Sequence, residues 1–199
     1  LKGPAEQRPQ EAGGLPRILL ELKEKLHLDT HTITGKTLGE IVDETNFSWK
    51  QKIVKSAGNP VYREGGIAVL KGNLAPNTAI IKQSAASESL LTHTGRAVVF
   101  DGLEDLANRI DSEDLDVNED DILVLRYIGP KGAPGMPEAG LIPIPKKLAK
   151  RGVKDMVRIS DGRMSGTASG TIILHVCPEA ADGGPLALVK SGDIISLDV

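Results

Sequence analysis

The sequence predicts a mixed α/β domain with a strongly curved, barrel-like sheet and flanking helices. Aromatic residues make up only 3% of the 199 residues, so the core must be built from Val, Ile, Leu and Ala. After about residue 60, short apolar runs outnumber amphipathic stretches, and Gly and Pro separate the runs, as expected where strands turn sharply. The length and a hydrophobic content of 40% suffice to bury the core of one domain.

The first part of the chain is polar and rich in proline. We therefore expect residues 1–14 to be a flexible leader or a cut end, and residues 15–199 to form the folded domain. Apolar residues at helical spacing predict an amphipathic helix over 15–28, and a second helix is predicted over 36–43.

The rest of the chain alternates between predicted strands and short predicted helices. Acidic residues at 111–114 and 118–121 are typical of solvated turns. Helical spacing predicts helices over 103–110 and 146–151. β-branched runs bounded by Gly, Pro and Asn predict strands over 67–70, 79–81, 97–100, 122–127, 156–159, 171–176 and 193–199.

Composition and charge exclude several classes of function. With 24 Lys and Arg against 27 Asp and Glu, the net charge of −3 gives no electrostatic footprint for a nucleic acid. The single cysteine, Cys177, excludes an internal disulfide and any zinc or cluster site built only from the thiolates of this chain. No apolar stretch of spanning length and no signal-peptide pattern occur, so we expect a cytoplasmic protein without a membrane partner.

The segment 160–170 is the most informative part of the sequence. Small and hydroxylated residues crowd between two predicted strands, and glycine recurs there at every fourth position. This composition suits a tight turn whose hydroxyls bond their own backbone. It also suits a rigid loop that presents Ser165 as a reactive hydroxyl. The Gly-x-Ser-x-Gly pattern of serine hydrolases is absent, because Arg163 and Thr167 occupy the glycine positions.

A second loop, 129–138, follows a predicted strand and is constrained by three prolines. It holds Glu138, which is either a surface residue or an oxygen ligand for a hard cation such as Mg²⁺. Because both loops follow strands, we expect them to open at one edge of the sheet. Two other motifs carry less information: residues 35–37 resemble a phosphate-binding loop but lack its first glycine, and residues 27–31 lack the glutamate of a zinc protease.

The order of these segments along the chain resembles the C-terminal domain of the dihydroxy-acid and sugar-acid dehydratases, the superfamily of dihydroxy-acid dehydratase and phosphogluconate dehydratase. The resemblance covers nearly the whole chain after about residue 11. It implies a swivelling β/β/α or barrel-like domain. The residues that carry it lie at 11–16, 34–40, 65–76, 129–138, 160–167 and 175–180.

The resemblance also implies a reaction and its site residues. Members of the family are hydro-lyases that convert a 2,3-dihydroxy acid into a 2-keto acid with Mg²⁺ and an iron-sulfur cluster. Ser165 would act as an alkoxide base that removes the C2 proton, and Thr167 would stabilise that base by hydrogen bonding. Glu138 would be a metal ligand for Mg²⁺. The cluster cysteines and the other Mg²⁺ ligands would come from an N-terminal domain that this chain lacks, so we expect the isolated chain to be inactive.

Residues 80–87 and 163–167 look more like the sugar-acid branch, of the arabinonate or xylonate type, than the branched-chain amino-acid enzyme. We accordingly expect a sugar-acid substrate and, by resemblance, a homo-oligomer. Three alternatives stay open: a dihydroxy-acid dehydratase, which would be mitochondrial in a eukaryote; a non-catalytic binding domain of the same fold; and a serine hydrolase that uses Ser165. Lys131 and Arg163 are either contacts for the substrate carboxylate or members of structural ion pairs.

Overall fold

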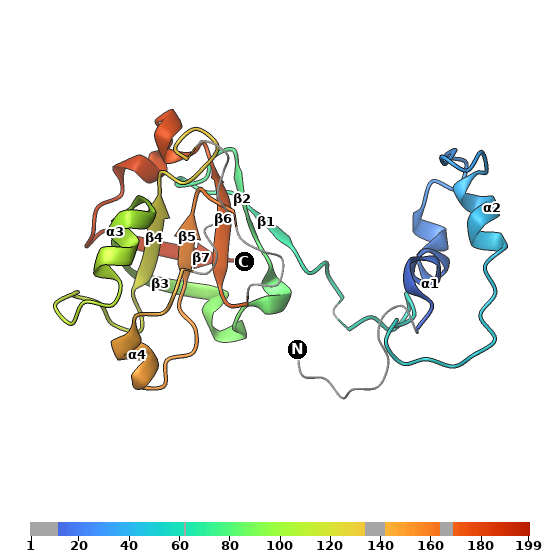
Figure 1. Ribbon diagram of the computed structural model, residues 1–199, viewed down its shortest axis with the longest axis horizontal. Coiled ribbons are helices and arrows are strands. Elements are labelled where there is room, and N and C mark those ends of the chain that lie inside the picture. The colour runs from blue at the N-terminus through green and yellow to red at the C-terminus, as the bar shows by residue number, and fades with distance from the viewer. Residues whose placement is uncertain (1–11, 62, 134–141, 164–168) are drawn as a thin grey trace. The chain divides into compact units, whose positions relative to one another are not determined.

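The computed structural model describes residues 12–61, 63–133, 142–163 and 169–199 (Figure 1). The chain divides into two compact units, Leu1–Arg63 and Glu64–Val199.

The described part of the first unit contains two short helices. The first, α1, spans Gly14–Glu21, and the second, α2, spans Leu38–Asp43. A capping box begins α2: the Thr37 side chain accepts the Glu40 amide, and the Glu40 side chain accepts the Thr37 amide at 2.7 Å. Thr37, the last residue of the motif at 35–37, is therefore the N-cap of α2 and not part of a phosphate-binding loop.

A sheet of seven strands forms a half-barrel in the second unit (Figure 1). The strand order is β1-β2-β6-β5-β4-β3-β7. The four central strands, β3 to β6, run parallel, and β2 and β7 join them antiparallel. The strands are β1 Ala68–Leu70, β2 Thr78–Ile81, β3 Thr92–Asp101, β4 Ile122–Arg126, β5 Arg158–Ser160, β6 Ile172–Cys177 and β7 Ile194–Asp198. The predicted fold class, a mixed α/β domain with a barrel-like sheet, is confirmed.

Side chains of the central strands alternate between two apolar clusters, so both faces of the sheet are buried. Ala97 and Val99 of β3 pack into one cluster with residues from β2, β6 and β7. Val98 and Phe100 of the same strand pack into the other cluster. That second face is covered by α3, which spans Gly102–Arg109, and by α4, which spans Lys146–Lys150.

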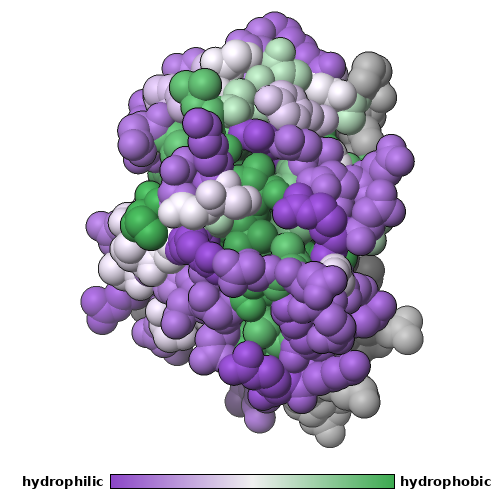
Figure 2. All heavy atoms as spheres, turned by 90° about the vertical axis from the view of Figure 1, so that its left-hand side faces the viewer, coloured by the Kyte–Doolittle hydropathy of each residue, from purple (hydrophilic) through white to green (hydrophobic). Residues whose placement is uncertain are grey.

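The side of the molecule that faces left in Figure 1, where α3 lies, is mostly hydrophilic, with apolar side chains in a narrow central band (Figure 2). Short 3-10 turns connect the remaining elements. They lie at Lys23–Lys25, Gln83–Ala85, Glu88–Leu90, Ala180–Asp182 and Pro185–Leu188.

Most predicted elements differ from the observed ones by one or two residues at an end, and two of them differ by more. The helix predicted over 15–28 ends at Glu21 and gives way to a 3-10 turn, because the chain bends at Leu22. Strand β3 begins at Thr92, five residues before the predicted start at residue 97. Residues 92–96 are polar and carry little strand signal, but they pair antiparallel with β7, whereas residues 97–101 pair with β4.

Candidate active site

Two loops leave neighbouring parallel strands at the same edge of the sheet. The first, residues 127–145, follows β4, and the second, residues 161–171, follows β5. Because β4 and β5 are parallel neighbours, their carboxyl ends lie side by side, as the sequence predicted. Ligand sites in sheets of this kind form outside the carboxyl ends of the strands.

Asp161 connects the starts of the two loops. Its side chain is 2% exposed and accepts the backbone N–H groups of Tyr127, Ile128 and Ala180, at 3.1, 3.1 and 3.0 Å. A buried carboxylate is stable only when its lone pairs are satisfied in this way. These three hydrogen bonds hold the segment after β4 and Ala180 close to the end of β5.

The backbone is strained around this carboxylate. Tyr127 has a φ of 65° and His175 a φ of 53°, values that side chains with a Cβ rarely adopt. The N–H of Tyr127 bonds Asp161, and the N–H of His175 donates to the Gly162 carbonyl at 3.1 Å. Gly162 itself has no room for a side chain, because a Cβ there would lie 2.4 Å from Ile128 Cδ1. Strain of this type gathers at functional sites.

A second buried acid, Glu179, holds the next turn of the first loop. Its Oε1 accepts the N–H groups of Lys131 and Gly132 at 2.6 and 3.1 Å, whereas its buried Oε2 has no hydrogen-bond partner among the residues that the structure describes. A Cβ on Gly129 would lie 2.0 Å from Oε2, so glycine is needed for this approach.

The far ends of both loops meet at a buried ion pair. Arg158 Nη2 donates to Asp155 Oδ1 at 2.7 Å, and the two side chains are 2% and 10% exposed. Arg158 also donates to the Ile142 carbonyl at 2.9 Å and to the Met156 carbonyl at 3.2 Å, and its Nη2 lies 3.5 Å from the Ser169 carbonyl.

Asp155 is held from the other side by hydroxyl and amide donors. It accepts the Ser87 hydroxyl at 2.7 Å and the Thr171 hydroxyl at 2.8 Å. Burial by itself would raise the pKa of Asp155, but the hydrogen bonds from Ser87 and Thr171 and the charge of Arg158 together lower it below its ordinary value. Asp155 is therefore an ionised partner for Arg158 at neutral pH.

The predicted site residues Glu138, Ser165 and Thr167 lie outside the described residues, so their roles stay predictions. Lys131 forms an ion pair with Asp182, and this hydrogen bond raises the pKa of Lys131. No recognisable sequence motif pointed to the charged groups of the site, which are the buried Arg158, Asp161 and Glu179 and the partly buried Asp155. In the sequence, these four residues are marked only as charged residues next to an apolar strand or within a glycine-rich loop.

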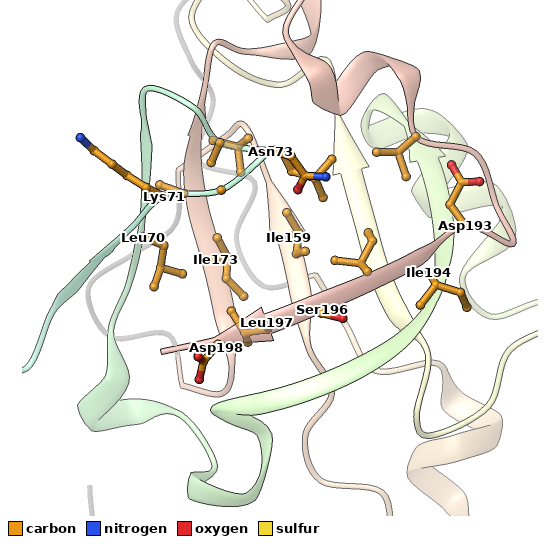
Figure 3. Close-up of a pocket in the computed structure, with 17 residues that line it drawn as sticks. Leu70, Lys71, Asn73, Ile159, Ile173, Asp193, Ile194, Ser196, Leu197 and Asp198 are labelled. Carbon is orange, nitrogen blue, oxygen red and sulfur yellow. The ribbon is translucent and has the colours of Figure 1, made fainter.

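The concave face of the half-barrel encloses a separate cavity of about 570 Å³ between the β1–β2 turn and β7 (Figure 3). Ile159 and Ile173 point into it, and Lys71 extends away from it. Ile159 alternates with Arg158 along β5, so the cavity and the ion pair lie on opposite faces of the sheet. The described loop residues do not line the cavity.

The described residues contain no group of three His, Cys, Asp or Glu side chains that could hold a metal ion. Two acidic runs that could have suggested such a site are paired with bases instead. Asp111 pairs with Lys146 at 2.7 Å, and this hydrogen bond lowers the pKa of Asp111. Asp121 pairs with Arg96 at 2.9 Å. Asp111 lies in an exposed turn, as the sequence predicted, whereas Asp121 is 2% exposed, so the prediction of a solvated turn at 118–121 is wrong for this residue.

No helix within the described ranges has the length and apolar character needed to cross a membrane.

A family model described as the C-terminal domain of dihydroxy-acid/6-phosphogluconate dehydratase matches residues 52–199.

Several curated proteins resemble the chain over nearly its whole length. It is 51% identical over 191 residues to an L-arabinonate dehydratase of Rhizobium leguminosarum bv. trifolii, an alignment covering 94% of this chain and 33% of that protein. It is 48% identical to a 6-deoxy-6-sulfo-D-gluconate dehydratase of Pseudomonas putida, with coverages of 94% and 33%. It is 45% identical to a dihydroxy-acid dehydratase of Methanococcoides burtonii, with coverages of 96% and 34%. The chain thus spans about a third of the length of these relatives.

Proposed function

Because the chain belongs to the dihydroxy-acid/6-phosphogluconate dehydratase family and matches its C-terminal domain, we propose that it forms the proton-abstracting half of a sugar-acid dehydratase. The substrate would be a 2,3-dihydroxy sugar acid and the product a 2-keto-3-deoxy acid. The names of relatives at 51% and 48% identity support a sugar-acid substrate over the branched-chain precursor, which is supported by a relative at 45% identity.

One observation carries this proposal: two loops leave the same sheet edge, and buried charged side chains hold each loop at both ends. Asp161 and Glu179 hold the starts, and Arg158 with Asp155 holds the ends. Anchors of this kind would give reactive groups on the two loops the fixed separation that catalysis needs. In the sequence, the residues proposed to react lie between these anchors.

In the proposed reaction, Ser165 as an alkoxide takes the proton from C2 of the substrate, and Thr167 donates a hydrogen bond that stabilises the alkoxide. The C3–O bond then breaks, and the leaving hydroxyl takes up the proton held by Ser165 and departs as water, which returns Ser165 to the alkoxide. The resulting enol tautomerises to the 2-keto acid. A free serine is too weak a base for the first step, so a fixed donor near Ser165 is required.

The donor chemistry of the chain fits one of the two expected cofactors. Carboxylate oxygens are ligands that Mg²⁺ prefers, so Glu138 would supply one ligand. When bound, Mg²⁺ would hold the substrate carboxylate and C2 oxygen and make the C2 hydrogen more acidic. An iron-sulfur cluster does not fit this chain alone, because Cys177 is its single cysteine and such clusters need several thiolates.

The test is 2-keto acid formation by the full-length parent, reconstituted with iron, sulfide and Mg²⁺, on pentonates, hexonates and 2,3-dihydroxyisovalerate. We expect activity on a sugar acid that disappears in Ser165→Ala and persists in Ser56→Ala, which changes an exposed serine of the first unit. Full activity of Ser165→Ala would contradict the assignment of the base. Turnover of 2,3-dihydroxyisovalerate alone would instead support the amino-acid branch.

A non-catalytic binding domain is the second candidate. It would bind a sugar acid without converting it, and calorimetry with the same panel of acids separates it from the enzyme. Binding by the intact parent without any product, under conditions that load the cofactors, would favour this candidate over the dehydratase.

A further inference from the structure

Arg158 is a charged residue at a position suited to an apolar one. Its neighbours in register on the two adjacent strands are Leu123 and Ile172, both buried. Replacing a buried ion pair with apolar side chains of similar volume is often neutral or stabilising. Packing therefore gives no reason for a guanidinium here, which suggests that its hydrogen bonds serve another purpose.

Those hydrogen bonds reach parts of the chain that are far apart in sequence. Arg158 Nη1 donates to the carbonyl of Ile142, the first described residue after 134–141. Its Nη2 approaches the carbonyl of Ser169, the first described residue after 164–168. One planar group therefore contacts the two described residues that follow, in the sequence, the segments with the proposed reactive side chains.

The guanidinium cannot rotate away from these carbonyls. Its Nε donates to Met156, and Asp155 fixes Nη2 while itself accepting hydroxyls from Ser87 and Thr171. Gly170, with a φ of 113°, passes directly over the pair: a Cβ there would lie 1.9 Å from Arg158 Nη2. The backbone of the second loop is thus shaped around the ion pair.

We propose that Arg158 is a positioning residue that couples the two loops, because one guanidinium holds both the Ile142 carbonyl and the Ser169 carbonyl. The proposal rests on the proposed dehydratase function. Lysine could not replace Arg158, since a single ammonium lacks the planar fork that reaches separated acceptors.

The kinetic test compares Arg158→Lys and Arg158→Met with the wild-type full-length parent. We expect kcat to fall about 10- to 100-fold, because small misplacements of reacting groups cost that much. KM for the sugar acid should stay within about threefold, since Arg158 does not contact the substrate in this proposal. Arg158→Lys keeps a positive charge beside Asp155, so it still tests the role of Arg158 if Arg158→Met does not fold.

The control is Arg96→Lys. Arg96 pairs with the buried Asp121 through two hydrogen bonds, at 3.2 and 2.9 Å, and none of its hydrogen bonds to described residues reaches either loop. The Arg96→Lys substitution should lower Tm while leaving kcat within about twofold of wild type. If the Arg158 variants lower Tm but keep wild-type kcat, or if Arg96→Lys lowers kcat as much as they do, the positioning role is wrong.

Hydrogen exchange on the 199-residue chain tests the coupling without any activity. In Arg158→Met we expect faster exchange in peptides 142–147 and 169–174 together, and unchanged exchange in β4. Faster exchange in only one of the two peptides would contradict the coupling. If instead the parent forms no 2-keto acid, or Ser165→Ala stays active, the proposed function fails while the exchange result still decides whether Arg158 joins the loops.

Discussion

Asp161 accepts the backbone N–H of Tyr127 at 3.1 Å, so a carboxylate at the start of one loop holds a left-handed residue at the start of the other. Both oxygens of Asp161 accept hydrogen bonds, whereas in the described part of the chain only one oxygen of the buried Glu179 does so. These two acids therefore respond differently to amide substitution.

We expect Asp161→Asn to lower the free energy of unfolding by about 2–3 kcal/mol, because an amide NH₂ would face a backbone N–H that loses its acceptor. Glu179→Gln should change it by less than about 1 kcal/mol, since the amide nitrogen can take the place of the unpartnered Oε2. Urea unfolding of both variants at neutral pH measures the difference. Equal losses would contradict the assigned bonding of the two side chains.

Gly170→Ala should destabilise the chain by about 2–4 kcal/mol, because it combines a left-handed backbone with a clash against Arg158. Gly152→Ala is a matched control, since Gly152 has a φ of 94° with no heavy atom near a built Cβ. It should cost only the backbone strain of about 1 kcal/mol. Thermal or urea unfolding gives the difference, and similar losses in both variants would show that the clash is absent.

The stabilisation by Asp155 should depend on pH. Because its pKa is lowered on folding, the ionised form stabilises the native state above the ordinary value of 3.8, and this contribution is lost as the pH falls through the lower native value. The stability difference between wild type and Asp155→Asn should be full at pH 6 and smaller at pH 3. Urea unfolding at both pH values tests this. A difference that grows as the pH falls would have the wrong sign.

Thr37→Ala should destabilise the first unit by about 1 kcal/mol, since it removes the cap of α2. Thr37→Ser keeps the hydroxyl and should change stability little. Trp49 is the single tryptophan of the chain and packs edge-on to Phe47 within this unit, so its fluorescence reports local unfolding. A urea midpoint that is equal in Thr37→Ala and Thr37→Ser would contradict the capping role.

Local pattern predicted the central strands well. Residues 97–100 form a strand because alternate side chains enter the two apolar clusters, and such alternation can be seen in the sequence. Residues 92–96 could not be predicted in this way, because they become a strand only by pairing with β7, about a hundred residues later in the sequence. Periodicity also did not locate the end of α1, since the apolar spacing continues past Glu21, where the helix ends.

The sequence by itself determined the mixed α/β class, the positions of most strands and the two loops expected at one sheet edge. It also indicated Glu138, Ser165 and Thr167, whose arrangement stays a prediction. Only the tertiary structure brought Asp155 and Arg158 together with Ile142, Ser169 and Ser87, and Asp161 together with Tyr127. Sequence periodicity reports burial along one strand or helix. The partner of a buried charge, however, comes from a distant segment, and its position depends on the packing of the whole sheet.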